Sequence, residues 1–206
     1  MAARPGDLSL FVYHALHDVR DERPVEYIFA YSVLTSRVKP PAGVLDVGGC
    51  ESFLAPQLAL RGYRVTVLDL RPCFNEAFPV RMLVGNVLTV QLEPSSFDAV
   101  LAISTVEHVG LPAYGQDIVC RDADVIAAHR IAEWLKPGGL AIITVPYGKR
   151  VRPATFERVY NRERLWMLTR PFRECTVVYA CGPSWARCDP RRAEREKAVA
   201  MLACVK

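Results

Sequence analysis

The sequence has no CxxC pair, no compact group of Cys and His with zinc-finger spacing, and no apolar run of the roughly 18 to 20 residues that a membrane-spanning helix needs. Its first residues contain no apolar signal core. We therefore expect a protein of the cytoplasm with no metal and no membrane partner. The seven cysteines are scattered, and several lie in apolar runs, so we interpret them as small core residues in a reducing compartment.

The sequence also lacks a large excess of one sign of charge, because the 206 residues carry a net charge of only +4. Most of the basic excess is arginine, and one cluster runs from Arg187 to Arg195. Glu194 and Glu196 interleave with that cluster, which favours a solvated surface over a nucleic-acid site. With 51% apolar residues the chain has enough material for one α/β domain over residues 1–206.

Short apolar runs alternate with helical patterns from Gly43 onward, which predicts a parallel sheet with right-handed crossovers. The last two expected strands are joined only by a polar connection, which is typical of an antiparallel pair. The prediction is a three-layer, Rossmann-like, doubly wound α/β sheet of about seven strands, mostly parallel with an antiparallel C-terminal edge pair. We expect these strands over 43–48, 63–69, 80–85, 97–103, 139–145, 173–180 and 198–205.

Residues 1–42 precede the sheet core of residues 43–206 and are expected to form an N-terminal helical cap. A helix begins near Arg23-Pro24, because proline suits a first helical turn, and Pro40-Pro41 ends it. Since a doubly wound sheet does not need this helix, it covers either the sheet or a ligand. Tyr27 and Tyr31 on the helix are candidates for a lid or for core packing.

An acid and two glycines follow the first expected strand, in Val44-Leu45-Asp46-Val47-Gly48-Gly49-Cys50-Glu51-Ser52. A second acid, Asp69, ends the next strand, where a carboxylate can bind both hydroxyls of a ribose. Asp46 stands before the glycines, so it suits a ligand with a cationic amino group, such as S-adenosylmethionine. A nicotinamide oxidoreductase needs G-x-G-x-x-G, and Cys50 and Ser52 break that pattern.

Five segments in this order resemble the class I S-adenosylmethionine-dependent methyltransferase family from about Gly43 to the C-terminus. They are the glycine-rich segment Leu45–Ser52, the ribose acid Asp69, Gly85-Asn86-Val87 near the expected adenine position, Phe97–Val109 as the fourth strand with its loop, and Leu135–Leu140 as the turn into the fifth strand. The resemblance implies S-adenosylmethionine as the cofactor. It also implies a set of cofactor-binding residues, namely Asp46, Gly48, Gly49, Cys50, Ser52, Asp69, Leu70, Asn86, Val87, Ser104 and Glu107.

The chain departs from the family pattern at three of these positions, because Cys50 and Ser52 occupy the second and third glycine positions and Asn86 replaces an acid. Cys50 stands where the family has its second glycine, so either its β-carbon crowds the methionine moiety or the loop shifts and Gly49 takes that place. Asn86 replaces the commoner Asp, and its amide oxygen can still accept a hydrogen bond from an adenine amino group. A turn role for Asn86 is the alternative.

His108 is the catalytic candidate, because it follows the fourth strand and an imidazole can take a proton from an attacking hydroxyl or amine. The alternative is a histidine that shapes the loop. Glu107 either orients His108 or closes over the cofactor. Tyr114 and Tyr147 are candidates for the acceptor pocket or for loop packing, whereas Asp98 opens its strand at the far end and is expected to be structural.

The acceptor is expected to be a small molecule, methylated at oxygen or nitrogen, with a sugar or a secondary metabolite among the candidates. The sequence offers no added recognition domain, and the loop after the fourth strand reads Ser104-Thr105-Val106-Glu107 instead of the [DN]-P-P-[YFW] motif that stacks a flipped base. Two alternatives stay open: a non-catalytic partner subunit that binds S-adenosylmethionine, and a methyltransferase acting on RNA or protein. A homodimer is compatible with the sequence.

Overall fold

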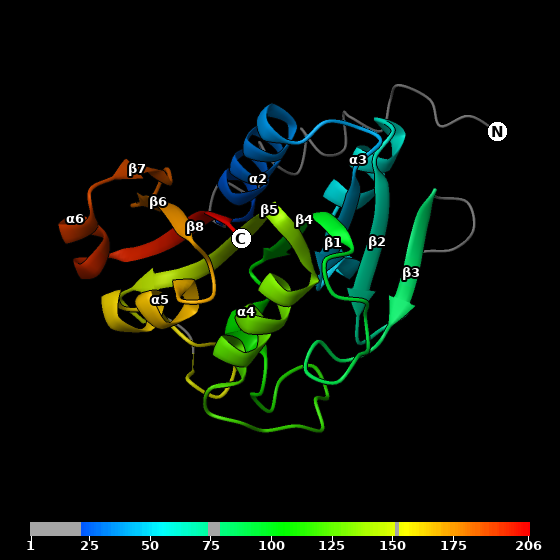
Figure 1. The fold of residues 1–206 in the computed structure, drawn as a ribbon. Coiled ribbons are helices and arrows are strands. Elements are labelled where there is room, and N and C mark those ends of the chain that lie inside the picture. The colour runs from blue at the N-terminus through cyan, green and yellow to red at the C-terminus, as the bar shows by residue number, and fades with distance from the viewer. Residues whose placement is uncertain (1–21, 74–78, 151–152) are drawn as a thin grey trace.

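Eight strands lie in the residues that the computed structural model describes, which are 22–73, 79–150 and 153–206. They are β1 (Gly43–Val47), β2 (Arg64–Asp69), β3 (Val80–Val84), β4 (Phe97–Ile103), β5 (Leu135–Gly148), β6 (Glu174–Cys181), β7 (Ala186–Cys188) and β8 (Lys197–Val205). They form one mixed sheet in the order β3-β2-β1-β4-β5-β8-β6-β7 (Figure 1). The first five are parallel, and the last three are antiparallel to their neighbours.

This sheet confirms the predicted fold class, including the antiparallel strands at the C-terminal edge. β8 is inserted between β5 and β6, so the chain ends inside the sheet and not at its rim. The connection from β6 to β8, which we predicted only as a polar connection, also contains β7 and a short helix, α6 (Pro190–Arg195). Asp189 caps that helix, because its carboxylate accepts a hydrogen bond from the Arg192 N–H at 3.0 Å, and Pro190 occupies the first turn.

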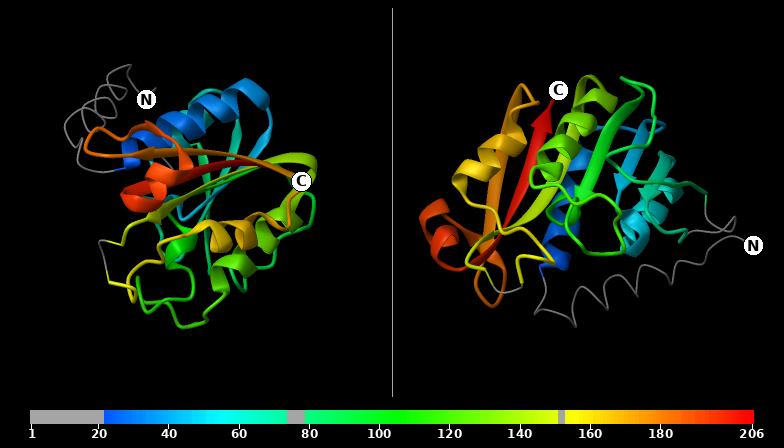
Figure 2. Two further views of the ribbon diagram at one scale, coloured as in Figure 1. Left: turned by 90° about the vertical axis from the view of Figure 1, so that its left-hand side faces the viewer. Right: turned by 90° about the horizontal axis from the view of Figure 1, so that it is seen from below.

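Helices cover both faces of the sheet, as the left view of Figure 2 shows. α2 and α3 lie on one face, and α4 and α5 lie on the other. No helix in the described ranges is both long and apolar enough to cross a membrane. The remaining helical bounds are α2 (Arg23–Arg37), α3 (Leu54–Leu60), α4 (Ala123–Trp134) and α5 (Arg162–Thr169), with 3-10 turns η1 (Gly49–Glu51) and η2 (Val106–His108).

The expected cap helix is α2, with Pro24 in its first turn and its end before the cis bond between Pro40 and Pro41. Its buried residues Ala30 and Leu34 pack on the sheet face that α3 shares. Residues 1–21 of the predicted cap lie outside the described residues. The described part of the cap therefore covers the sheet, and its first turn reaches the site described below.

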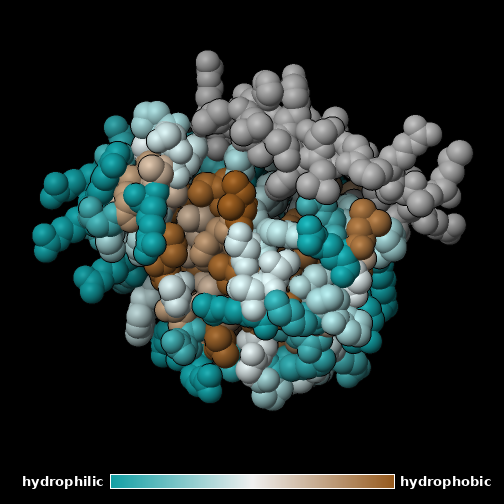
Figure 3. Space-filling view, turned by 90° about the horizontal axis from the view of Figure 1, so that it is seen from above, coloured by the Kyte–Doolittle hydropathy of each residue, from teal (hydrophilic) through white to brown (hydrophobic). Residues whose placement is uncertain are grey.

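Three clusters of buried apolar side chains hold the layers together. The largest lies under α4 and α5 and includes Trp134, which is 1% exposed. The smallest joins α2 to β6 and β8 and leaves Val25 and Phe29 half-buried. Figure 3, seen from above, shows apolar residues in brown beside hydrophilic residues in teal at the left. Because each fully buried large apolar side chain contributes about 1.5–3 kcal/mol, the clusters fix the strand ends from which the site loops project.

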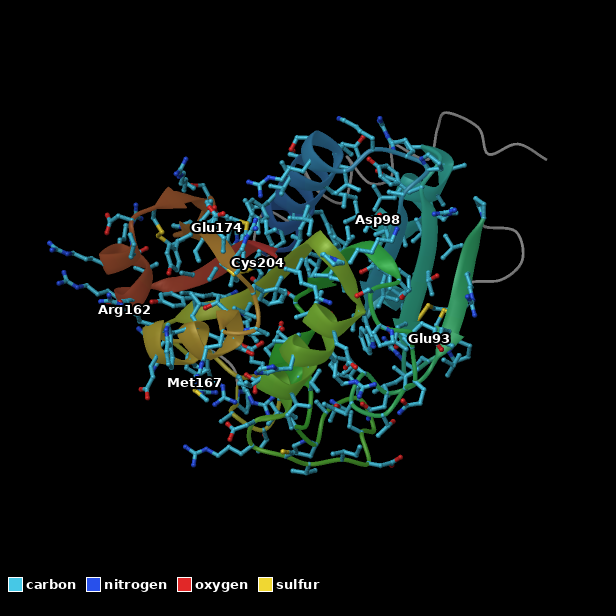
Figure 4. The ribbon with its side chains drawn as sticks, viewed as in Figure 1. Glu93, Asp98, Arg162, Met167, Glu174 and Cys204 are labelled. Carbon is cyan, nitrogen blue, oxygen red and sulfur yellow. A yellow bond between two sulfur atoms is a disulfide. The ribbon has the colours of Figure 1, made fainter. Side chains whose placement is uncertain are left out.

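Asp98 lies near the start of β4, at the end of the sheet opposite the carboxyl ends of the parallel strands (Figure 4). Its carboxylate accepts a hydrogen bond from the Gly43 N–H at 2.7 Å and an ion pair from Lys136 at 2.7 Å. These contacts tie the starts of β1, β4 and β5 together. The structural role expected for Asp98 is confirmed.

Six of the seven cysteines form disulfides, so the structure does not show the thiols that we expected of a reducing compartment, although Cys181 and Cys204 are core residues as expected. Cys204, labelled in Figure 4, is buried on β8 and is bonded to Cys175, its cross-strand neighbour on β6. Cys181 is also buried and is bonded to Cys188, and only Cys120 is free. The third disulfide joins Cys50 to Cys73. These pairings depend on strand register and loop paths that local sequence patterns do not define.

Candidate functional site

A pocket opens at the carboxyl ends of β1, β2 and β4, where the strand order reverses between β1 and β4. It encloses about 820 Å³ including the part that is open to solvent. This is the size and the position at which doubly wound sheets bind small ligands. Ten of the residues predicted from sequence line it: Asp46, Gly48, Ser52, Asp69, Leu70, Asn86, Val87, Ser104, His108 and Tyr114.

The two glycines after β1 are required by close approaches on either side of the loop. Gly48 has φ of +73°, and a β-carbon there would lie 2.4 Å from the side chain of Thr105. A β-carbon on Gly49 would lie 2.7 Å from the carboxyl group of Asp46. Gly48 lines the pocket, whereas Gly49 is buried behind it against Asp46. Gly49 therefore has a packing role against Asp46, and its cofactor contact stays a prediction.

Asp46 is buried at the end of β1 with only 1% of its surface exposed, yet it lines the pocket. Its Oδ2 atom has no hydrogen-bond partner. Burial raises the pKa of Asp46 to about 7, the Ser52 hydroxyl lowers that pKa, and the nearby Asp69 raises it further. A buried carboxylate oxygen without a partner is costly unless a ligand supplies a donor. The site is therefore built for a cationic or hydrogen-bond-donating group at this position.

Asp69 ends β2 with both carboxylate oxygens turned toward the loops beside the pocket. One oxygen accepts a hydrogen bond from the Cys50 N–H at 3.1 Å, and the other accepts from the Arg71 N–H at 3.1 Å. Each carboxylate oxygen keeps acceptor capacity for another donor. This arrangement suits a pair of neighbouring hydroxyl groups.

Cys50, predicted as a cofactor contact, does not line the pocket. Its backbone N–H faces Asp69, and its sulfur atom lies 3.0 Å from the carbonyl oxygen of Arg71. The side chain is thus directed to the loop after β2.

Asn86 follows β3 and adopts the turn role that the sequence left open. Its Oδ1 atom accepts a hydrogen bond from the Leu88 N–H at 2.9 Å, two residues along the chain. Asn86 and Val87 nevertheless line the pocket. The side chain therefore shapes the turn first, and any ligand contact uses its remaining capacity.

The first turn of α2 supplies a wall of the pocket that the sequence analysis only partly anticipated. Tyr27, considered there as a lid or core residue, lines the pocket and is 8% exposed. Arg23 lines it too and donates a hydrogen bond to the Ile103 carbonyl at 3.3 Å. Arg23 was not among the predicted site residues, and the only available signal was its place beside Pro24 at the start of the cap helix.

Two buried glutamates lie behind the loop that follows β4. Ser104, with φ of +42°, donates its hydroxyl to the carboxylate of Glu26 at 2.7 Å. Glu26 was not predicted as a site residue, and burial raises its pKa. Glu107 is 1% exposed, its Oε2 atom has no partner, and burial raises its pKa well above the ordinary value. Glu107 does not line the pocket, and its cofactor contact stays a prediction.

His108 lines the pocket from η2 and is held in one orientation. Its Nδ1 atom lies 2.7 Å from the carbonyl oxygen of Phe156. Because a carbonyl only accepts, Nδ1 carries the hydrogen, and in the neutral ring Nε2 keeps its lone pair. The rings of Tyr114 and Phe156 pack edge-on against the imidazole, at centroid distances of 5.1 and 4.9 Å. This geometry leaves Nε2 as the basic nitrogen, 3.7 Å from Glu107 Oε1.

Tyr147 lies outside this pocket, which corrects its assignment to the acceptor site. β5 continues to Gly148, beyond the expected end at residue 145, and so Tyr147 pairs with Ala198 inside the sheet. Its ring is 1% exposed and packs 4.8 Å from the ring of Tyr179. It borders a separate shallow depression with Glu194.

Comparison with known proteins gives consistent results. Residues 45–143 match a family model described as a methyltransferase domain. The chain is 30% identical over 141 residues to the ubiquinone biosynthesis O-methyltransferase of Xanthomonas campestris, which covers 64% of this chain and 50% of that protein. It is 28% identical over 155 residues to an uncharacterized methyltransferase of Mycobacterium bovis, covering 71% and 66% respectively. The chain therefore spans about half the length of the Xanthomonas relatives that it matches.

Among solved structures, the fold is similar to that of the 1,6-didemethyltoxoflavin-N1-methyltransferase of Burkholderia thailandensis. The TM-score is 0.61 at 21% identity, and the match covers 100% of this chain and 92% of the other. That protein was crystallised with 1,6-didemethyltoxoflavin and S-adenosylhomocysteine. At this identity the likeness establishes a common fold.

Proposed function

We propose that this chain is a class I S-adenosylmethionine-dependent methyltransferase, that it binds S-adenosylmethionine in the central pocket, and that it methylates an oxygen or nitrogen atom of a small molecule. The observation that carries the proposal is the buried, unpartnered Oδ2 atom of Asp46 beside a glycine loop. A sugar or a secondary metabolite is the proposed class of acceptor. Residues 1–206 are proposed to act as one domain in the cytoplasm.

The residues of the pocket fit this cofactor. Asp46 would accept from the methionine ammonium group, which supplies the donor that its Oδ2 atom lacks. Asp69 would accept from the two ribose hydroxyls, and Arg23 provides a cation for the methionine carboxylate at the other side of the pocket. When bound, the cofactor supplies an electrophilic methyl group, so the protein has to bind, orient and exclude water more than activate.

His108 is proposed to take the proton from the acceptor hydroxyl or amine. Its Nδ1–H donates to the Phe156 carbonyl, and so Nε2 is the nitrogen that can receive the proton. Tyr114 is 46% exposed and borders the same end of the pocket, where it offers an aromatic face to an acceptor. Glu107 lies beside the imidazole, and burial raises the pKa of its carboxyl group well above the ordinary value.

The comparisons support a small acceptor without identifying it. The Xanthomonas relative is named an O-methyltransferase of ubiquinone biosynthesis, and the Burkholderia structure holds a small heterocycle. We extend that class of acceptor to this chain as a proposal. Methylation of RNA or protein and a non-catalytic role are the outcomes against which it is tested.

Calorimetric titration with S-adenosylhomocysteine, with NAD as comparator, tests the cofactor. We expect micromolar binding of the first and none of the second. Release of S-adenosylhomocysteine from S-adenosylmethionine is then measured with a panel of small hydroxyl and amine acceptors, and with RNA at low salt. Binding without turnover on any acceptor would indicate a non-catalytic subunit, and preference for NAD would refute the interpretation of Asp46.

A further inference from the structure

Cys50 and Cys73 join the two loops that flank the ribose end of the pocket. Cys50 lies in η1 after the glycines, and Cys73 lies in the loop after β2, with a separation of 23 residues in the chain. Their Cα atoms are 5.3 Å apart, and their sulfur atoms are bonded. Cys50 is half-buried and Cys73 is exposed, so a small thiol reagent can reach the pair from solvent.

The disulfide joins the two segments whose backbone N–H groups bind the Asp69 carboxylate. The Cys50 N–H donates to one oxygen of Asp69, and the Arg71 N–H donates to the other. Both donors therefore belong to the two segments that the disulfide connects. When the disulfide is present, these segments and the carboxylate between them are constrained together.

From this geometry we propose that Cys50 and Cys73 form a reversible thiol–disulfide modification site that sets the affinity of the pocket for its nucleoside ligand. The inference rests on the proposed function, because it assigns the ribose to Asp69. It also gives Cys50, which replaces the family's second glycine, a role that ligand contact does not provide.

The chemistry requires an oxidant, and a low-molecular-weight disulfide such as glutathione disulfide supplies it. The thiolate of one cysteine attacks the reagent, forms a mixed disulfide and releases one thiol. The second cysteine then attacks the mixed disulfide and releases the other thiol. Overall, two protein thiols lose two protons and two electrons, and one reagent disulfide becomes two thiols.

Oxidation is expected to tighten binding. The disulfide orders the donors to Asp69 before the ligand arrives, so less ordering has to accompany binding. In the reduced state a Cys50 thiol can donate to the Arg71 carbonyl, 3.0 Å from its sulfur, and the Cys73 segment is released. We expect affinity for S-adenosylhomocysteine to be about three- to tenfold higher in the oxidised protein. By reciprocity, the ligand should shift the thiol–disulfide equilibrium by the same factor.

The other two disulfides provide an internal control. Cys175–Cys204 and Cys181–Cys188 join β6 to β8 and β6 to β7, at the sheet edge remote from β1 and β2. Their reduction should not alter ligand affinity. Cys188→Ser removes one of these links without touching the pocket.

The experiment compares the full chain with its Cys73→Ser and Cys188→Ser variants. Each protein is equilibrated in glutathione buffers of graded ratio, its disulfides are assigned by alkylation and mass spectrometry, and its affinity for S-adenosylhomocysteine is measured by calorimetry. We expect affinity to follow the Cys50–Cys73 bond in the full chain and in Cys188→Ser. Cys73→Ser should show the low affinity at every glutathione ratio.

Three results would overturn the inference. Failure of Cys50 and Cys73 to bond at any glutathione ratio would remove the site. Equal affinity of the oxidised, reduced and Cys73→Ser proteins would remove its effect on the pocket and leave the proposed function intact. No binding in any state would refute the proposed function and this inference with it. Mass spectrometry would still show, independently of binding, whether Cys50 and Cys73 form a disulfide.

Discussion

Asp46→Asn should weaken the ligand site while making the unliganded protein more stable at neutral and higher pH. Burial raises the pKa of Asp46 to about 7 from the ordinary 3.8, so the folded protein keeps a proton that the unfolded chain releases. Stability from this group is complete below about pH 4 and is lost as the pH rises to about 7. At about 1.4 kcal/mol per pKa unit, the loss is on the order of 4 kcal/mol. Asparagine carries no charge, so the Asp46→Asn protein does not lose this stability as the pH rises.

The assay is chemical unfolding of both proteins between about pH 4 and pH 8, with the difference in free energy of unfolding followed against pH. Asp46→Asn should gain relative to the parent by a few kcal/mol as the pH rises. Titration with S-adenosylhomocysteine should show the opposite effect, with affinity at least about tenfold lower in the variant at pH 8 because the ammonium group loses its charged partner. Parent affinity should also rise with pH up to about 7 as Asp46 ionises.

Asp98→Asn is the matched control, since it removes a carboxylate at the opposite ends of the parallel strands, away from the pocket. Burial raises the pKa of Asp98, but the Lys136 ammonium and the Gly43 N–H lower it by more, so the net shift is downward. Its stabilisation is therefore present above the ordinary carboxyl pKa and is lost as the pH falls, the reverse of Asp46. Ligand affinity should not change. A pH-independent difference for Asp46→Asn, or unaltered ligand binding, would refute the reasoning.

Four other substitutions separate the roles of the site residues. Asp69→Ala should weaken binding of S-adenosylhomocysteine by about 1–3 kcal/mol, measured by calorimetry, and unchanged affinity in a folded variant would contradict the placement of the ribose. His108→Ala should keep that affinity and lower kcat by about 10²- to 10⁴-fold; normal turnover would make the residue structural. Gly48→Ala should cost about 1–3 kcal/mol of unfolding free energy, because φ is +73° and Thr105 occupies the space of a β-carbon. Tyr147→Phe should leave both affinity and turnover unchanged, and a large loss of either would return Tyr147 to the site.

The sequence predicts those parts of the fold that depend on short, local residue patterns. The five parallel strands and the Asp46-to-Asp69 spacing follow from apolar runs ended by acids and glycines, and the structure places them together. β5 is longer than its apolar run suggests, because pairing with β8 extends it, and this removes Tyr147 from the loop. α6 is only six residues long, so its periodicity is too short to detect and only the Asp189-Pro190 start marks it.

The contributions of Arg23, Glu26 and the cysteine pairs could not be predicted in the same way. Most of them depend on which distant segment packs beside the residue, and even the Cys181–Cys188 pair, seven residues apart, depends on the pairing of β6 with β7. Glu26 reads as a polar residue of an amphipathic helix, yet it is fully buried against Ser104. Asn86 is the intermediate case, since its turn bond is local and was considered from the residue type alone.

The orientation of His108 illustrates why a catalytic geometry is harder to predict than a cofactor motif. Phe156, which accepts from His108, belongs to a segment 48 residues further along the chain. Arg158 fixes that segment: it is 8% exposed, its backbone N–H donates to the Glu107 carbonyl at 3.0 Å, and its guanidinium donates to the Val109 and Cys120 carbonyls. A buried guanidinium is stable only when its donors are satisfied, so Arg158 and the loop after β4 must form together. The tautomer of His108 is thus a consequence of packing between two loops, whereas the Asp46-Val47-Gly48-Gly49 pattern is contained in a single short segment of the chain.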